Sequence, residues 1–243
     1  MRLIGHRGAR HEAPENTLGG FRHIIELGLK AVEFDVRLLA DQQLAVIHDD
    51  NFLRTSGLDQ SVAMTSAFQL VHTDNRVGWD QWPQPEPTPL LTDVLSLIEH
   101  FEHIEIEVKA VNDEQQAQVV GQKLHHLLEG WQDRVSITSF DLKVLQALKE
   151  QQSSFKRGLL VELPLGEVII DIAKQLDCSR IGLRDQFATQ ELVKKIHAAH
   201  MLCSVWTVNN IERARQLAQW QIDGLITDIP TQMIQANIKG CIV

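Results

Sequence analysis

Apolar residues recur along the chain in two alternating patterns, short continuous runs and longer stretches with helical spacing. The first run is Leu3-Ile4, and it is followed by Glu15–Leu27, where apolar positions recur every three or four residues. Gly28 fits the end of this predicted helix, because glycine readily adopts the left-handed conformation that terminates helices. The same alternation continues toward the end of the chain. It predicts an α/β protein built from parallel β–α–β units.

The pattern predicts nine strands and eight helices. The strands are expected at Leu3-Ile4, Ala31–Val36, Leu44–Ile47, Ile104–Val108, Val135–Thr138, Arg157–Val161, Arg180–Leu183, Met201–Trp206 and Ile222–Ile226. The helices are expected at Glu15–Leu27, Leu90–Phe101, Asp113–Leu128, Asp141–Glu150, Leu165–Leu176, Thr189–His200, Asn210–Trp220 and Pro230–Asn237.

One strand departs from the parallel pattern. Asp35 and His48 are 13 positions apart, with a turn-like segment at 40–43 between them. A parallel crossover needs a dozen or more residues between its strands, usually a helix. Val36–His48 is therefore predicted as a hairpin that returns His48 to the end where the preceding strand emerges. The eight remaining strands are the number that closes a (β/α)8 TIM barrel, and a doubly wound open sheet is the alternative.

A segment of about residues 49–89 interrupts the alternation and contains Pro83, Pro85, Pro87 and Pro89. Loops of this length are usually functional or carry small structure of their own. We expect an insertion beside the barrel mouth that covers the site or shapes its specificity, or else a packing flap without ligand contact. The whole chain, 1–243, is expected to form one barrel domain that contains this insertion.

Composition narrows the functional classes. The net charge of −9 and a pI of about 5.6 argue against wholesale binding of nucleic acid or anionic membranes, but not against a local pocket for one phosphate. Three cysteines without metal-ligand spacing indicate free thiols. No apolar stretch approaches the roughly 20 residues of a membrane span, and no secretory leader precedes the first strand. We therefore expect a cytoplasmic protein, and the sequence leaves its oligomeric state open.

Three carboxylates stand at predicted strand ends. Glu33 and Asp35 are two residues apart, so both side chains lie on one face of their strand, and Glu107 ends the next barrel strand. The carboxylates would repel one another unless a cation lies between them. Oxygen ligands favour Mg²⁺ or Ca²⁺. The alternative is ion pairing with nearby basic residues.

Cations and histidines accompany these carboxylates. Arg7 and Lys109 suit a phosphate group, and they could equally act as counter-ions to the carboxylates. His6 and His48 end rim elements and could transfer protons near neutral pH during cleavage of a phosphodiester.

Eight short motifs follow one another along the chain: His6-Arg7-Gly8, Pro14-Glu15-Asn16-Thr17, Glu33-Phe34-Asp35-Val36, His48-Asp49, Glu107-Val108-Lys109, Ser139-Phe140, Trp206-Thr207-Val208-Asn209 and Asp223-Gly224-Leu225-Ile226-Thr227-Asp228. In this order they resemble the motifs of the glycerophosphodiester phosphodiesterase family. The resemblance spans Met1 to about Asp228 and is closer to cytoplasmic bacterial members. It implies a TIM-barrel hydrolase that converts glycerophosphodiesters, such as glycerophosphocholine and glycerophosphoethanolamine, to sn-glycerol 3-phosphate and an alcohol.

The resemblance also implies a role for each matched residue. Glu33, Asp35 and Glu107 would bind one divalent cation, Mg²⁺ or Ca²⁺, and His6 and His48 would form the acid/base pair. Arg7 and Lys109 would bind phosphate, and Trp206 would line the pocket against the glycerol or alcohol group. Glu15 and Asn16 would brace the site from behind, or simply cap the first helix.

The family likeness further implies two steps, through a cyclic phosphate that water then opens. Two alternatives stay open at this point. One is a lyase related to bacterial phosphatidylinositol-specific phospholipases, which stops at the cyclic phosphate. The other is a protein that binds glycerophosphodiesters without turning them over. The expected partner in each case is a small molecule.

Overall fold

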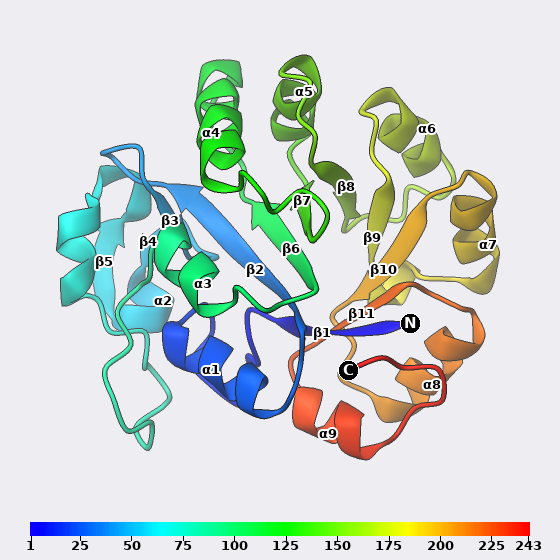
Figure 1. Ribbon diagram of the computed structural model, residues 1–243, viewed down its shortest axis with the longest axis horizontal. Coiled ribbons are helices and arrows are strands. Elements are labelled where there is room, and N and C mark those ends of the chain that lie inside the picture. Colours follow the sequence, from blue (N-terminus) through cyan, green and yellow to red (C-terminus); the bar gives the residue numbers. More distant parts are fainter.

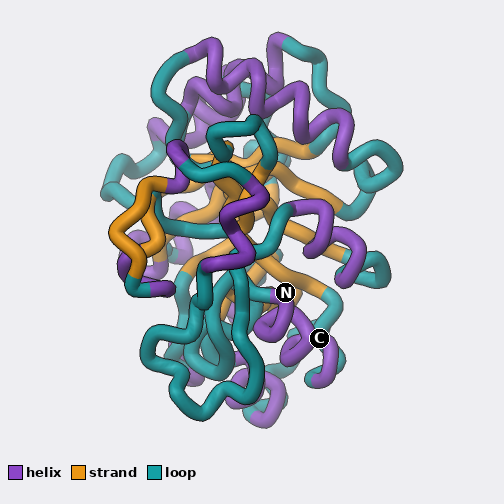
Figure 2. The backbone as a smooth tube through the Cα atoms, turned by 90° about the vertical axis from the view of Figure 1, so that its left-hand side faces the viewer, coloured by secondary structure: helices purple, strands orange, loops and turns teal.

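The computed structural model describes residues 1–243, with a closed sheet surrounded by helices and a separate two-stranded sheet formed by β4 (Asn51–Phe52) and β5 (Leu58–Ser61) (Figures 1 and 2). The strands are β1 (Arg2–His6), β2 (Ala31–Leu38), β3 (Leu44–Val46), β4 (Asn51–Phe52), β5 (Leu58–Ser61), β6 (His103–Val108), β7 (Val135–Ser139), β8 (Lys156–Val161), β9 (Arg180–Arg184), β10 (Leu202–Trp206) and β11 (Gly224–Thr227). The helices are α1 (Leu18–Glu26), α2 (Leu53–Ser56), α3 (Leu91–Leu97), α4 (Glu114–Leu127), α5 (Leu142–Glu150), α6 (Val168–Gln175), α7 (Gln190–Ala198), α8 (Ile211–Gln219) and α9 (Pro230–Gln235), with 3₁₀ turns at Val62–Met64, Ala67–His72 and Asp185–Phe187.

Eight parallel strands close the barrel. Their order is β1-β11-β10-β9-β8-β7-β6-β2, and β1 also pairs with β2 through Gly5–Val32 and His6–Glu33. This last pairing joins the two edges of the sheet, so the TIM barrel is confirmed and the open-sheet alternative is wrong. The predicted hairpin is also confirmed, because β3 runs antiparallel to β2 with Val36 opposite Val46.

Alternation along each strand divides the core into two regions. In β6, Ile104, Ile106 and Val108 belong to the large apolar cluster, whereas Glu105 and Glu107 lie at the intervening positions. Since successive side chains point to opposite faces of a strand, the apolar set packs against the helices and the polar set enters the barrel. The barrel interior therefore carries charged groups that the outer layer excludes.

The first helix begins later than the sequence pattern predicts. Glu15–Leu27 was expected to be helical, but α1 begins at Leu18 and the Thr17 side chain caps it by accepting from the Gly20 N–H at 3.0 Å. Hydroxyl side chains are preferred at this position because they satisfy a free N–H of the first turn. Glu15 and Asn16 therefore do not cap the helix, and they remain in the preceding loop.

The segment at 49–89 has structure of its own. A small apolar cluster holds it against the β2–β3 hairpin. The cluster consists of Leu39, Ala45, Ile47, Phe52, Val62 and Leu70. Glu86 also accepts a hydrogen bond from the Gly19 N–H at 2.9 Å, which ties the segment to α1. In Figure 1 it lies to the left of the barrel, in blue-green colours. We refer to residues 49–89 as the insertion.

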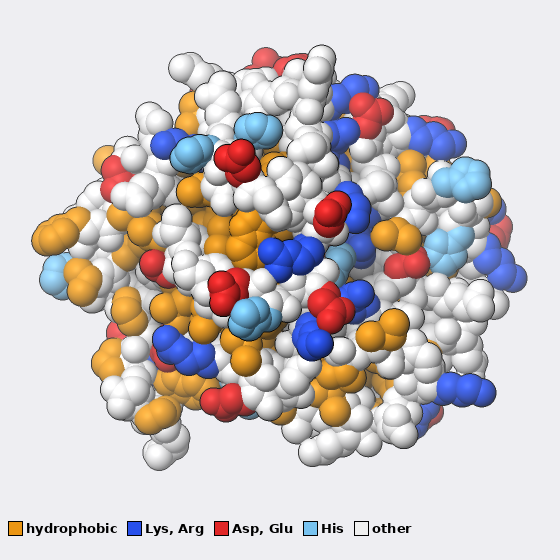
Figure 3. Space-filling view, viewed as in Figure 1, with side chains coloured by type: hydrophobic (Ala, Val, Ile, Leu, Met, Phe, Trp, Pro, Cys, Tyr) orange, Lys and Arg blue, Asp and Glu red, His pale blue; other side chains and the backbone are white.

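Surface charge is mixed on the face drawn in Figure 3. Lys and Arg side chains alternate there with Asp and Glu side chains, and histidines lie among them. No helix is both long enough and apolar enough to cross a membrane.

Candidate active site

A pocket of about 420 Å³ opens at the carboxyl ends of the barrel strands. Loops and strand ends at this face carry the active sites of TIM-barrel enzymes. Seven of the sequence-predicted site residues line this pocket: His6, Arg7, Glu33, His48, Glu107, Lys109 and Trp206. The other three, Glu15, Asn16 and Asp35, do not line the pocket, but each contacts Arg7, which does. The structure thus brings together residues separated by up to two hundred positions in the chain.

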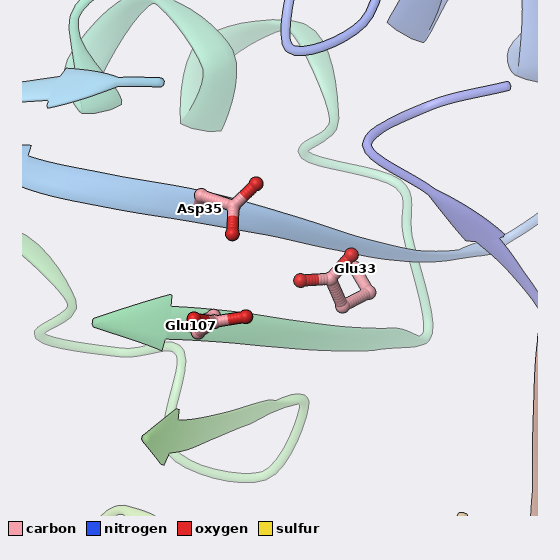
Figure 4. A group of neighbouring side chains, drawn as sticks. All are labelled: Glu33, Asp35 and Glu107. Carbon is pink, nitrogen blue, oxygen red and sulfur yellow. The ribbon is translucent and has the colours of Figure 1, made fainter. Parts of the chain in front are cut away.

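The three carboxylates come from two neighbouring strands, β2 and β6 (Figure 4). Asp35 lies opposite Glu107 in the parallel register, and Glu33 is one pleat further down the same face. One oxygen from each carboxylate lies within 4.8 Å of the other two. All three side chains are buried, with Asp35 fully so.

This donor set fits a divalent cation. Glu33 Oε2 and Asp35 Oδ1 are buried and have no hydrogen-bond partner in the protein. Burial and the neighbouring Asp35 carboxylate raise the pKa of Glu107 to about 7, and burial with the same neighbour raises the pKa of Glu33. Hard oxygen donors that repel one another and keep atoms without a hydrogen bond are suited to Mg²⁺ and Ca²⁺.

Arg7 and Lys109 lie against the same carboxylates. Arg7 Nε is 3.1 Å from Asp35 Oδ2, and Lys109 Nζ lies 3.5 Å from Asp35 Oδ1 while also pairing with Glu107. Although burial acts in the opposite direction, the two cations hold the pKa of Asp35 well below its usual range. The counter-ion role considered for these residues is therefore present, and it leaves Glu33 without a Lys or Arg partner.

His6 is held by a carboxylate on the last barrel strand. Its Nδ1 lies 2.6 Å from Asp228 Oδ1, and Asn209 Nδ2 donates to the second oxygen of Asp228 at 2.7 Å. Burial lowers the pKa of His6. Burial acts to raise the pKa of Asp228, but the hydrogen bond and charge of His6, together with Asn209 and Arg10, lower it to about 2. A neutral ring beside an ionised carboxylate carries its proton on Nδ1. Nε2 is thus the basic nitrogen, 3.8 Å from Glu33 Oε2.

His48 repeats this arrangement from the opposite side of β2. Its Nδ1 lies 2.7 Å from Asp49 Oδ1. Burial lowers the pKa of His48, while Arg54 and His48 together hold the pKa of Asp49 below its ordinary value despite partial burial. Arg37 Nε also donates to the His48 carbonyl oxygen at 2.9 Å, which fixes the backbone of the hairpin end. Both histidines therefore present Nε2 as the free nitrogen.

The loop after β1 is shaped by residues with unusual backbone angles. Arg7 has φ of 52° and Asn16 has φ of 55°, and the Asn16 N–H donates to the Arg7 carbonyl oxygen at 2.9 Å. Gly8 has φ of 90°, and a Cβ there would lie 3.1 Å from the Gly20 carbonyl group. Such angles in non-glycine residues cost free energy and persist only where surrounding contacts hold them.

Glu15 and Asn16 contact the residues that face the pocket. Glu15 accepts from Arg7 Nη1 at 2.9 Å, and Asn16 Nδ2 donates to Asp35 Oδ2 at 2.9 Å. Bracing of the site by Glu15 and Asn16 stays a prediction, and these contacts are the ones through which it would act.

Arg54 of α2 joins the two sides of the site. Its terminal nitrogens each donate to one Glu15 oxygen at 2.7 Å, and its Nε donates to Asp49 Oδ2 at 2.6 Å. Paired hydrogen bonds between guanidinium and carboxylate are strong and directional. Glu15 in turn holds Arg7 and Asp49 holds His48, so the insertion positions residues on both sides of the pocket.

Three residues in this network had no role from the sequence. Asp49 and Asp228 stand within the quoted motifs, so their positions could have suggested partners for the histidines. Arg54 belongs to the irregular insertion, and no periodicity or spacing pointed to it. Its role depends on how the insertion folds back over the loop after β1.

The fold and the pocket together define a TIM-barrel enzyme whose polar site lies at the carboxyl ends of the strands. Comparison with known families gives a specific assignment, because residues 6–232 match the glycerophosphoryl diester phosphodiesterase family. The chain belongs to this family and is a phosphodiesterase. The resemblance carried by the sequence motifs is thereby confirmed.

A curated relative matches nearly the whole chain, and solved structures share its fold. A glycerophosphodiester phosphodiesterase of Caldanaerobacter subterraneus is 28% identical over 98% of this chain and 98% of its own. A phosphodiesterase structure from Oleispira antarctica, in complex with the product sn-glycerol-3-phosphate, has a TM-score of 0.88 at 24% identity and covers 98% and 96% of the two chains. A structure from Silicibacter pomeroyi has a TM-score of 0.87 at 23% identity, with 97% and 92% coverage.

Proposed function

We propose that the protein hydrolyses glycerophosphodiesters such as glycerophosphocholine and glycerophosphoethanolamine to sn-glycerol 3-phosphate and an alcohol. The observation that carries this proposal is the presence of two Asp-paired imidazoles and three clustered carboxylates in one pocket. The sn-glycerol-3-phosphate bound by the Oleispira relative supports the identity of the product.

Glu33, Asp35 and Glu107 would hold one divalent cation, Mg²⁺ or Ca²⁺. When bound there, this ion neutralises negative charge on the phosphoryl oxygens. The Arg7 guanidinium and the Lys109 ammonium add positive charge at the same place and orient the phosphate group. Trp206 closes the far side of the pocket against the glycerol or alcohol group.

The histidines move the protons. In the first step the neighbouring glycerol hydroxyl loses its proton to one imidazole as its oxygen bonds to phosphorus, and the other imidazole protonates the departing alkoxide. In the second step the two histidines exchange roles, so that one deprotonates water and the other returns a proton to the glycerol oxygen. Free Nε2 atoms on both rings suit this exchange, and either histidine can begin as the base.

Metal removal tests the role of the carboxylates. We expect EDTA to abolish release of glycerol 3-phosphate from glycerophosphocholine, and Mg²⁺ or Ca²⁺ to restore it, because the carboxylates would otherwise repel the phosphate. Undiminished activity after complete metal removal would contradict the metal role. Phosphorus NMR of the product separates hydrolysis from a lyase, which would accumulate the cyclic phosphate, and ligand binding without turnover would indicate a binding protein.

Substitution tests the histidines. We expect His6→Ala and His48→Ala each to lower turnover by about 10²–10⁴-fold, the usual range for a lost general acid or base. Exchange of an exposed histidine outside the pocket, His100→Ala, serves as the control. A near-wild-type rate for either variant would remove that histidine from the mechanism.

A cytoplasmic location is part of the proposal. All three cysteines are unpaired, which suits a reducing compartment. Cell fractionation tests it directly.

A further inference from the structure

The pocket has two halves of different chemistry. The half formed by β1, β2, β6 and the hairpin end contains every basic group that lines the pocket: His6, Arg7, Arg10, Arg37, His48 and Lys109. The half formed by the ends of β7 to β10 is lined by Phe140, Leu160, Glu162, Trp206 and Thr207. Glu162 is the one charged residue in this second half.

Two aromatic rings form the wall of the second half. Phe140 and Trp206 meet edge to face with their centroids 5.4 Å apart. The indole Nε1 of Trp206 donates to the Gly182 carbonyl oxygen at 3.1 Å, so its N–H is already satisfied. Gly182 leaves room for this packing, because a Cβ there would lie 2.6 Å from Leu160 Cδ2 and 3.6 Å from Trp206 Cδ1.

The aromatic surface open to a ligand is chiefly that of Trp206. Lys109 Nζ lies 5.9 Å from the centroid of Phe140, so this ring already faces a cation from the other half. Among the aromatic side chains, tryptophan attracts cations to its face most strongly. Phe140 then acts as the support that fixes the Trp206 ring.

Glu162 provides an unpaired negative charge beside this wall. It follows β8 and is two residues after Leu160, so both side chains line the pocket from the same face. Its side chain is exposed and has no ion pair or hydrogen bond within the protein. The neighbouring carboxylate of the same loop, Glu167, is bound by Lys195 at 2.6 Å outside the pocket.

We propose that Trp206 and Glu162 form a subsite for a positively charged alcohol group, so that the enzyme prefers choline and ethanolamine esters to esters of neutral polyols. This inference rests on the proposed function and specifies its substrate class. The phosphate of such a substrate lies among the cations of one half, and its ammonium group lies between an aromatic ring and a carboxylate in the other. Each charged end of the substrate then faces pocket groups of the opposite charge.

Competing substrates test the preference. The ratio of kcat/KM for glycerophosphocholine to that for glycerophosphoglycerol is measured for the metal-loaded enzyme, and we expect it to be on the order of tenfold. Glu162→Gln should move this ratio toward one, whereas Glu162→Asp, which keeps the charge, should retain part of it. Glu167→Gln is the matched control and should leave the ratio as it is in the wild type.

Two results would overturn the subsite: equal kcat/KM values for both esters in the wild type, or a wild-type ratio in Glu162→Gln. Absence of hydrolysis of every ester with every metal would instead refute the proposed function. In that event calorimetric titration with choline still tests the subsite. The subsite requires that the wild-type protein binds choline and that Glu162→Gln binds it more weakly. Circular dichroism melting of each variant verifies that it is folded.

Discussion

At the residue scale, the site depends on carboxylates that hold other polar groups rather than on isolated side chains. Asp228 and Asp49 each accept from the Nδ1 of one histidine, and the Glu15 carboxylate holds Arg7. Hydrogen bonds to ionised partners of this kind are about twice as strong as neutral ones. They also fix which ring nitrogen carries the proton, which decides where each imidazole can react.

Asp228→Asn tests this arrangement at His6. An amide can donate to Nδ1 and favour the wrong tautomer, so we expect kcat/KM to fall by about 10²–10⁴-fold without loss of the fold. The control is Asp223→Asn, which alters another Asp–His pair, with His197 at 2.9 Å, away from the pocket. Equal activity of the two variants would contradict the role of Asp228.

The same pair has a defined pH dependence. Because the folded-state pKa of Asp228 is lowered to about 2 from an ordinary value of 3.8, the ionised carboxylate contributes to stability above about pH 4. This contribution is lost as the pH falls through about 2. We therefore expect the difference in urea midpoint between wild type and Asp228→Asn to be smaller at pH 2 than at pH 4.

At this scale the sequence motifs predict which residues form the site but not which of them pair with one another. The positions of Glu33, Asp35 and Glu107 could be predicted, since strand periodicity and order place them on one face at one end of the barrel. The separate ion pairs could not be predicted, because Lys109 contacts both Glu107 and Asp35 and no spacing rule decides between them. Only side-chain geometry settles such choices.

At the element scale, the insertion is the part that the sequence described least. Its prolines and irregular pattern predicted an insertion beside the barrel mouth but not the elements it contains, which are β4, α2 and β5. Short elements of two to four residues leave no periodic signal, and here they are held by a small apolar cluster. Arg54 connects the insertion to the site because it binds Glu15 and Asp49. Contact of the insertion with a ligand stays a prediction.

Arg54→Ala tests this connection. We expect kcat/KM to fall by about 10–100-fold, as is typical when partners of site residues are removed, with a small change in melting temperature. Arg54→Lys should retain only part of the wild-type kcat/KM, because an ammonium group cannot reproduce the paired hydrogen bonds of the guanidinium.

Arg76→Ala provides the matched control, since Arg76 is another arginine of the insertion and pairs with Asp74 away from the pocket. A loss of activity as large in Arg76→Ala as in Arg54→Ala would mean that the insertion responds to destabilisation in general.

At the scale of the whole molecule, alternation of strands and helices was sufficient to predict the number and order of barrel strands. Closure is different, because periodicity describes each strand separately and says nothing of whether the first and last strands meet. In the structure β1 pairs with both β11 and β2. The ion pair between Glu105 and Arg180 inside the barrel was likewise not predictable, because it depends on pairing across the barrel.

Glu105 and Arg180 make this interior testable. Arg180 Nη1 donates to Glu105 Oε1 at 2.7 Å, and both side chains are buried inside the barrel. Arg180→Met should lower the free energy of unfolding by about 3–5 kcal/mol, since it leaves a buried charge without its main partner. The double variant Glu105→Leu, Arg180→Met should regain most of that loss in urea titrations. Wild-type stability of the single variant would show that water or His103 compensates the carboxylate.

The separate apolar cluster of the insertion has a consequence for inactivation. It contains six residues, compared with 51 in the main core, and regions with few buried contacts open at lower free energy than the rest of a domain. Opening of this cluster would release Arg54, and with it the anchoring of Asp49 and Glu15, while the barrel remained intact. Catalysis would then fail at a lower denaturant concentration than global unfolding, so that the enzyme would lose function while still native by its circular dichroism.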